Sequence, residues 1–72
     1  MRYYLVENRE NEYYCTEFPT EKEAFDFASL TWDKYLTPWD KKRINEYFIG
    51  AMPDHIDGFS YDELEIIKSW RM

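Results

Sequence analysis

Large aromatic rings must build most of the core of this chain, because aliphatic side chains are scarce. The 72 residues include seven Tyr, five Phe and three Trp, but only ten Leu, Ile and Val together. A chain of this length buries only about 60% of its unfolded surface, whereas a single large ring buries roughly 150–250 Å². Aromatic residues therefore compensate for the small number of core positions. Any ring left outside the core is a candidate for contact with a partner.

Length and cysteine content predict one domain, spanning residues 1–72, in a reducing compartment. Cys15 is the only cysteine, so no intramolecular disulfide can form. The first residues are interrupted by charge too early for a signal peptide. No apolar run approaches the roughly 20 residues that a bilayer span needs. We therefore expect a cytoplasmic protein without a membrane partner.

The charge balance disfavours a nucleic-acid partner. The net charge is −6, and it is uneven: residues 1–33 carry −5, residues 34–52 carry +2 and residues 53–72 carry −3. Neutralising phosphates needs clustered Lys and Arg, whereas this acidity keeps a domain soluble or favours docking on a basic surface. A protein partner with a basic surface, or a second copy of the chain, fits this balance better.

Two β-prone runs near the N-terminus predict a hairpin. Residues 2–7 and 12–18 are rich in Tyr, Val and Thr and are separated by the polar residues 8–11. If that four-residue loop sets the register, Val6 faces Tyr13 and Tyr4 faces Cys15.

Alternation divides the side chains of this hairpin between two apolar faces. One face holds Tyr4, Val6, Tyr13 and Cys15. The other holds Tyr3, Leu5, Tyr14 and Phe18, with Glu7 and Glu12 near the turn. Alternation alone does not decide which face is the core. We expect the first face to be covered by a helix, with Cys15 as a small buried side chain.

A capping box opens the first predicted helix. Thr20 is a favoured N-cap, and Glu23 stands three residues later. The helix is expected over 21–35. Its core-facing side chains follow helical spacing: Phe25, Ala28, Trp32 and Leu36.

The rest of the chain predicts a short helix and one or two further strands. Thr37-Pro38 is a helix start, so a second helix is expected from Pro38 to about Ile44. Residues 45–52 are expected as a third strand, with continuation of the helix as the alternative. Residues 53–58 are a polar loop with Gly58 in a left-handed turn position.

The tail is ambiguous between strand and helix. Ser60 and Glu63 form another capping box, whereas Ile66-Ile67 and Trp70 favour a strand over 64–70. We expect an α+β fold with the order ββααβ and a tail strand or helix. Its small, mainly antiparallel sheet has three to four strands, with one long and one short helix packed on one face.

The assembled pattern resembles small acidic proteins of gut Firmicutes, which are often encoded on phages or other mobile elements and have no known activity. The likeness rests on short motifs: Tyr-Tyr-Leu-Val-Glu-Asn at 3–8, Thr-Glu-Phe at 16–18, Lys-Glu-Ala at 22–24, Trp32, Leu36-Thr37, Lys41-Lys42-Arg43 and Ile-Ile-Lys-Ser-Trp at 66–70. The resemblance implies a bacterial cytosol and an accessory gene, favours the strand in the tail, and transfers no functional residue.

Motifs for catalysis, metals or cofactors are not found. One Cys and one His stand forty residues apart, and the Asp54–Gly58 segment lacks the spacing of a calcium loop. Two glycines cannot build the phosphate-binding loops of nucleotide enzymes. The basic triplet Lys41-Lys42-Arg43 is interpreted as a solvated face. We expect no cofactor and no metal, and a non-enzymatic protein; an enzyme would need a pocket that joins His55 to Cys15 or to a pair of carboxylates.

The remaining rings and acids of the hairpin are the candidate contact surface. We expect a small acidic module that binds a protein, as a mobile-element inhibitor of a host protein, through Tyr3, Leu5, Glu7, Glu12, Tyr14, Phe27 and Leu30. Mimicry of nucleic acid by carboxylates is a special case, which Arg2, Arg9 and Lys22 interrupt. The alternative is self-assembly of a homo-oligomeric structural domain with no separate ligand.

Overall fold

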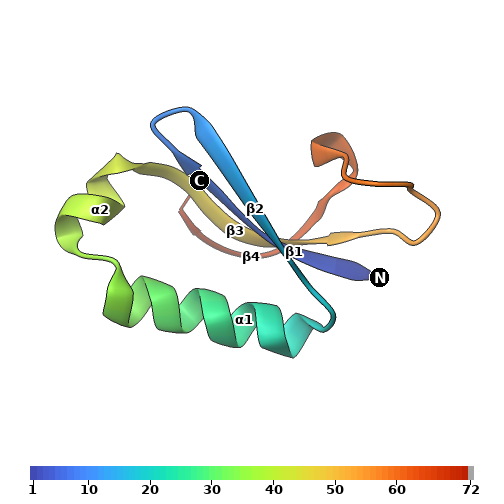
Figure 1. Cartoon of the computed structure of the whole chain (residues 1–72), viewed down its shortest axis with the longest axis horizontal. Coiled ribbons are helices and arrows are strands. Elements are labelled where there is room, and N and C mark those ends of the chain that lie inside the picture. Colours follow the sequence, from blue (N-terminus) through green and yellow to red (C-terminus); the bar gives the residue numbers. More distant parts are fainter. Residues whose placement is uncertain (72) are drawn as a thin grey trace.

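A computed structural model describes residues 1–71 of the chain. Figure 1 shows how its helices and strands are arranged. The elements are β1 (Arg2–Arg9), β2 (Glu12–Phe18), α1 (Glu21–Leu30), a π-helical turn η1 (Thr31–Tyr35), α2 (Pro38–Arg43), β3 (Ile44–Met52), a 3₁₀ turn η2 (Tyr61–Glu63) and β4 (Glu65–Arg71). The expected α+β class is confirmed, and so is the strand in the tail.

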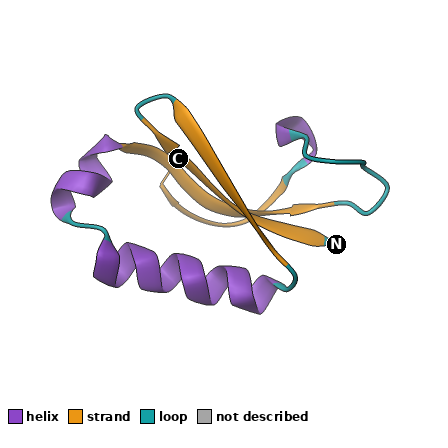
Figure 2. Ribbon diagram, in the orientation of Figure 1, coloured by secondary structure: helices purple, strands orange, loops and turns teal. Residues whose placement is uncertain are grey.

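All four strands form one antiparallel sheet, in the order β2-β1-β3-β4. β1 and β3 are the inner strands, and β2 and β4 are the edges. Helix α1 runs beneath the sheet, whereas α2 lies at the end near the hairpin turn (Figures 1 and 2). The inner strands can therefore be covered on both faces of the sheet.

The expected register of the hairpin was wrong. Val6 pairs with Cys15 and Tyr4 pairs with Glu17, and the pairing runs on to Arg9 and Glu12. Glu10 and Asn11 have φ of 50° and 69°, the left-handed backbone of a two-residue hairpin turn. A two-residue turn replaces the expected four-residue loop, so the register moves by two residues and both faces keep their members.

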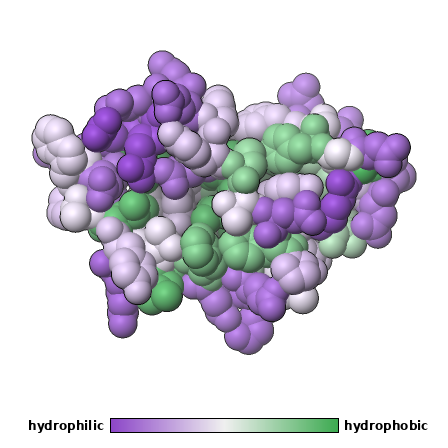
Figure 3. Space-filling view, viewed as in Figure 1, coloured by the Kyte–Doolittle hydropathy of each residue, from purple (hydrophilic) through white to green (hydrophobic). Residues whose placement is uncertain are grey.

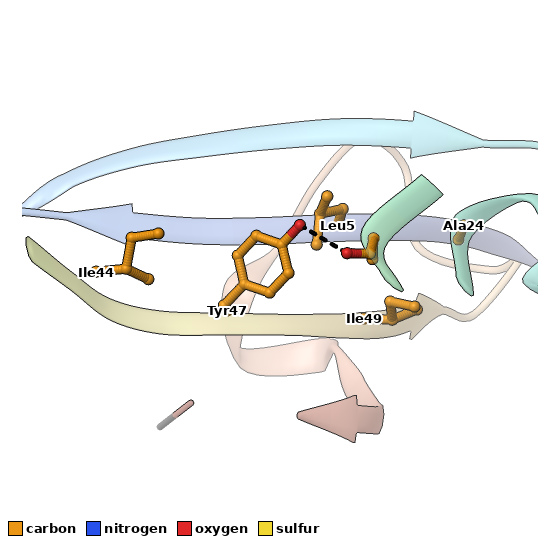
Figure 4. Close-up of a cluster of buried hydrophobic side chains, with 6 residues drawn as sticks. Leu5, Ala24, Ile44, Tyr47 and Ile49 are labelled. Atoms are coloured by element: carbon orange, nitrogen blue, oxygen red, sulfur yellow. Dashed lines mark hydrogen bonds between the residues drawn. The ribbon is translucent and has the colours of Figure 1, made fainter. Parts of the chain in front are cut away.

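The face that α1 covers is opposite to the one we expected. Leu5, Tyr47 and Ile49 form the main core with the helix, as Figure 4 shows. The pairing of β3 with β1 places these three side chains on the face of Tyr3 and Leu5. Because strand β3 lies far from the hairpin in the sequence, the residues of the hairpin alone did not indicate which of its faces is buried.

Small side chains let α1 approach the sheet closely. Ala24 and Ala28 are fully buried, whereas Phe25, expected in the core, is 44% exposed and stacks on Trp70 at 5.9 Å. Trp32 and Leu36 lie half-buried at the edge of the core. Thr20 accepts a hydrogen bond from the Glu23 backbone N–H, as its N-cap position predicts.

The other face of the sheet has a second, smaller core. Tyr4, Val6, Phe48 and Met52 are buried there, and Ile56 and Leu64 pack over them from the chain between β3 and β4. The Arg2 guanidinium holds this segment, because it donates to the backbone oxygens of Ile56 and Gly58. Gly58 has φ of 72°, the left-handed conformation expected for it. The cover reaches β2 at Tyr13, whose ring packs on Tyr61 at 5.8 Å, but Tyr13 and Cys15, which we expected in the core, are still exposed.

The predicted second helix and third strand are confirmed. Thr37 and Asp40 form a complete capping box at the start of α2. At the other end of α2, Arg43 pairs with Glu10 in the hairpin turn at 2.5 Å. Part of the basic triplet, expected as a solvated face, is therefore engaged: Lys41 also lies 4.8 Å from the centre of the Trp32 ring.

Replacement of Gly50 by Ala is expected to destabilise the fold through the second core. A Cβ at Gly50 would lie 2.9 Å from Leu64 Cδ2 and 3.3 Å from Leu64 Cβ. Overpacking of this kind costs about 1–3 kcal/mol, and urea unfolding of Gly50→Ala measures it. In the double variant with Leu64→Ala the two costs should add only in part, because the 2.9 Å contact with Cδ2 is gone and only the 3.3 Å contact with Cβ remains. Additive costs would contradict the proposed contact.

Candidate functional site

The described part of the chain has a cleft between α1 and the β1–β2 hairpin, on the helix side of the sheet. Its volume is ≈ 390 Å³, near the lower end of the usual 300–1,000 Å³ for ligand pockets. Three strands and the helical segment supply its walls: Leu5, Glu7, Arg9, Tyr14, Thr16, Phe27, Thr31 and Tyr47.

The floor of the cleft is rigidly built. Leu5 is only 5% exposed and Tyr47 is fully buried. The Tyr47 hydroxyl donates a hydrogen bond of 3.1 Å to the Ala28 backbone oxygen, which ties β3 to α1 (Figure 4). Trp32 packs against the same ring, with centroids 5.0 Å apart. A ligand in the cleft would therefore rest on side chains that the core already fixes.

The rim of the cleft exposes apolar surface. Tyr14 on β2 and Phe27 on α1 are 52% and 47% exposed, and Phe27 is supported by Phe18 at 5.3 Å. Leu30 is also exposed and lies one turn after Phe27, beside it on the solvent side of α1. Apolar groups lie open across the middle of the face seen in Figure 3, with hydrophilic groups at both ends.

Three carboxylates and one guanidinium surround the turn end of the cleft. Arg9 contacts Glu7 at 2.9 Å and Asp40 at 3.9 Å. Glu12 accepts a hydrogen bond of 2.6 Å from the Tyr14 hydroxyl. Because that bond favours the protonated phenol, it raises the pKa of Tyr14. Arg43 also lies near Asp40 and pairs with Glu10 in the turn, so four carboxylates here face two guanidinium groups and the turn end keeps an acidic excess.

Burial raises the pKa of Tyr47 to about 12, and the negative charge of Glu7 adds to the shift. Both effects disfavour the phenolate. Tyr47 is thus a neutral hydrogen-bond donor throughout the physiological range.

The cleft brings together four of the seven residues expected at the contact surface: Leu5, Glu7, Tyr14 and Phe27. Glu12 joins them through Tyr14, and Leu30 extends the rim. Tyr3 lies near the other end of β1 and packs half-buried against the main core. Leu5, which we expected to be partly exposed, is instead part of the buried floor.

Sequence reasoning missed four lining residues, and three of them had a usable signal. Arg9 and Thr16 continue the alternation that placed Leu5 and Tyr14 on this face. Thr31 stands four residues after Phe27, on the same side of the helix. Tyr47 had no local signal, because only the pairing of β3 with β1 carries it under the cleft.

Other kinds of site find little support among residues 1–71. There, no cluster of three or more His, Cys, Asp or Glu side chains has the geometry to hold a metal ion. Neither His55 nor Cys15 lines the cleft. None of the helices described combines the length and apolarity that crossing a membrane requires.

Comparison of the chain with protein-family models, with curated proteins and with solved structures gives no match. The geometry of the chain itself is therefore the basis for a functional proposal.

Replacement of Tyr47 by Phe is expected to remove the bond between β3 and α1 and to change the pH dependence of stability. Loss of one hydrogen bond costs about 0.5–1.5 kcal/mol at neutral pH. Because the folded-state pKa of about 12 exceeds the ordinary value of 10.0, the wild-type advantage is complete below pH 10 and is lost as the pH rises towards 12. Urea unfolding of both proteins across this range tests the prediction. A difference that does not change with pH would contradict it.

Proposed function

We propose that this protein is a non-catalytic protein-binding module whose contact surface is the cleft between α1 and the β1–β2 hairpin. The observation that carries the proposal is the composition of the cleft: a fixed apolar floor, an exposed rim of Tyr14, Phe27 and Leu30, and an acidic end. Aromatic side chains bordered by charge are typical of protein contact surfaces.

The chemistry of the lining supports binding rather than catalysis. Its hydroxyls belong to Tyr14, Thr16, Thr31 and Tyr47. The Tyr14 hydroxyl is engaged by Glu12 and the Tyr47 hydroxyl by a backbone oxygen. The one cation of the lining, Arg9, is engaged by Glu7. A nucleophile beside a free base, which covalent catalysis needs, is not among these lining residues.

The partner that fits is a peptide segment with one large apolar side chain beside a Lys or Arg. The apolar side chain would enter between Phe27 and Leu5. The cation would approach Glu12 and Asp40 at the turn end. At about 30 Å³ for each water of the liquid, the cleft of ≈ 390 Å³ holds on the order of a dozen waters, and such a side chain would displace part of them. The net charge of −6 would also speed the encounter with a basic partner.

The resemblance to proteins of mobile elements gives the proposed binding a biological setting. A small acidic module from such an element would act in the cytoplasm by occupying a basic surface of a host protein. We favour this over mimicry of nucleic acid, because Arg9 interrupts the acids around the cleft.

A matched pair of substitutions on β2 tests the site. Tyr13 and Tyr14 are neighbours with exposures of 54% and 52%, but alternation puts them on opposite faces of the sheet. Peptides selected by phage display against the purified protein serve as probes. Tyr14→Glu should weaken their binding at least tenfold, the size of a contact that contributes more than about 1.4 kcal/mol. Tyr13→Glu should change it less than about threefold.

Two further readouts define the outcomes. Selected peptides should be enriched in a basic residue next to an apolar one, and their affinity should fall with added salt. Their binding should shift the NMR signals of Phe27 and Thr31. Equal losses in the two Tyr variants, or shifts confined to the opposite face, would contradict the proposal.

A further inference from the structure

The two edges of the sheet differ in how well they are protected against another strand. β4 has two register shifts in its pairing with β3 and carries Lys68 and Arg71. β2 pairs with β1 over seven residue pairs without a shift, and every residue from Glu12 to Glu17 is exposed. Irregular pairing and charged side chains, Lys above all, are common protections of an edge. β2 has no irregularity and no Lys, and its two charges are Glu12 and Glu17.

The hairpin turn fixes which backbone groups of β2 point outward. In a two-residue turn, the closing pair, here Arg9 and Glu12, exchanges backbone hydrogen bonds, and such pairs then alternate along the strands. Glu12, Tyr14, Thr16 and Phe18 therefore direct their N–H and C=O groups to β1. Tyr13, Cys15 and Glu17 direct theirs away from the sheet, where they are free for another strand.

A second copy of β2 fits this edge in one register that uses the whole strand. An antiparallel pair must join outward-pointing residues to outward-pointing residues. Centred on Cys15, all seven residues of both strands overlap: Cys15 faces Cys15 of the second copy, and Tyr13 faces Glu17 of the second copy. Shifting the centre by one residue keeps the hydrogen-bond pattern but shortens the overlap.

The charges of β2 are compatible with this register. Glu12 lies opposite Phe18 of the second copy, so no two carboxylates face each other. The Tyr13 hydroxyl can donate to Glu17 across the pair. The two Glu17 side chains stand about 14 Å apart at 3.4 Å per residue, beyond the Debye length of about 8 Å at physiological salt.

We propose that β2 pairs antiparallel with β2 of a second copy, about a two-fold axis at Cys15, so that two four-stranded sheets join into one. The inference rests on the edge of the strand and is independent of the function proposed for the cleft. Facing residues of an antiparallel pair lie on the same side, so both α1 helices lie on one side of the joined sheet. The two β1 strands are then about 14 Å apart, because three strand spacings of about 4.8 Å separate them. Packed helices need only about 8–10 Å between their axes, so the two α1 helices have room beside each other.

The native cysteine reports directly on this register. Facing residues of a hydrogen-bonded antiparallel pair have Cα atoms about 5.5 Å apart, within the 4.4–6.8 Å that a disulfide spans, but their Cβ atoms are also about 5.5 Å apart, so the bond needs a small local adjustment of the two strands. A mild oxidant at slightly alkaline pH, with the purified full chain, should link two copies through Cys15. The matched control is Tyr13→Cys with Cys15→Ser, in which the two thiols are about 14 Å apart. We expect at least a tenfold lower yield of linked dimer in the control.

A third variant tests the backbone pairing without the thiols. Tyr13→Pro, combined with Cys15→Ser and compared with Cys15→Ser alone, removes an outward N–H and no hydrogen bond to β1. Sedimentation of the reduced Cys15→Ser protein should show dimers that increase with concentration and with salt, which screens the net charge of −6. The proline should lower the dimer fraction at least tenfold, with an unchanged circular dichroism spectrum.

Several outcomes would overturn the proposal. Equal cross-linking from positions 13 and 15 would indicate random collision. A ladder of larger species would indicate pairing of β2 with β4 of the next copy. A strict monomer at high micromolar concentration would leave β2 unpaired. If Tyr13→Pro unfolds, the comparison of cysteine positions still decides.

Discussion

The pairing of β1 with β3 is the interaction on which the rest of the structure depends. Both strands lie inside the sheet, and alternation sends their side chains in two directions. Leu5 and Ile49 face α1, whereas Val6 and Phe48 face the chain between β3 and β4. One pair of strands thus supplies two cores, which is how a chain with few aliphatic residues finds enough positions to bury.

The two faces of the sheet are covered by different kinds of structure, and this difference decides which side chains remain exposed. Ala24 and Ala28 bring α1 close to the sheet, so the flanking rings of this helix stand at its sides. The cover on the other face is an irregular segment, held in part by the Arg2 guanidinium. Neither cover extends fully over β2. The rings of that strand stay about half exposed, although Tyr61 contacts Tyr13 from one face and Tyr14 lines the cleft beside α1 on the other.

Strand β2 therefore offers two surfaces that do not compete for the same groups. The side chain of Tyr14 faces the cleft beside α1, whereas the free backbone groups of Tyr13, Cys15 and Glu17 point sideways from the sheet edge. In the two-fold arrangement that we propose, both clefts open on the same side of one sheet. A partner with two basic segments would then meet two copies of the same site.

The sequence by itself determined the local elements of this protein. Thr20 and the Thr37-Pro38 pair predicted where the helices begin, and the β-prone runs predicted the hairpin, the third strand and the tail strand. These features depend on residues close together in the chain. The members of each face of the hairpin also followed from alternation, so Leu5, Glu7 and Tyr14 were placed together correctly.

Only the tertiary structure decided which face is covered, and with it the place of the cleft. Both faces of the hairpin are apolar, so the choice depends on Tyr47 and Ile49 of β3, which come forty residues later. The exposure of Cys15 depends on the segment after β3, whose Ile56 and Leu64 pack on the inner strands and whose Tyr61 contacts β2 at Tyr13. The register followed from left-handed backbone at Glu10 and Asn11; asparagine adopts this conformation readily but glutamate does not, so the pair was a weaker signal than Asn-Gly. Local propensity fixes the elements, whereas burial is settled by the contacts that distant parts of the chain make.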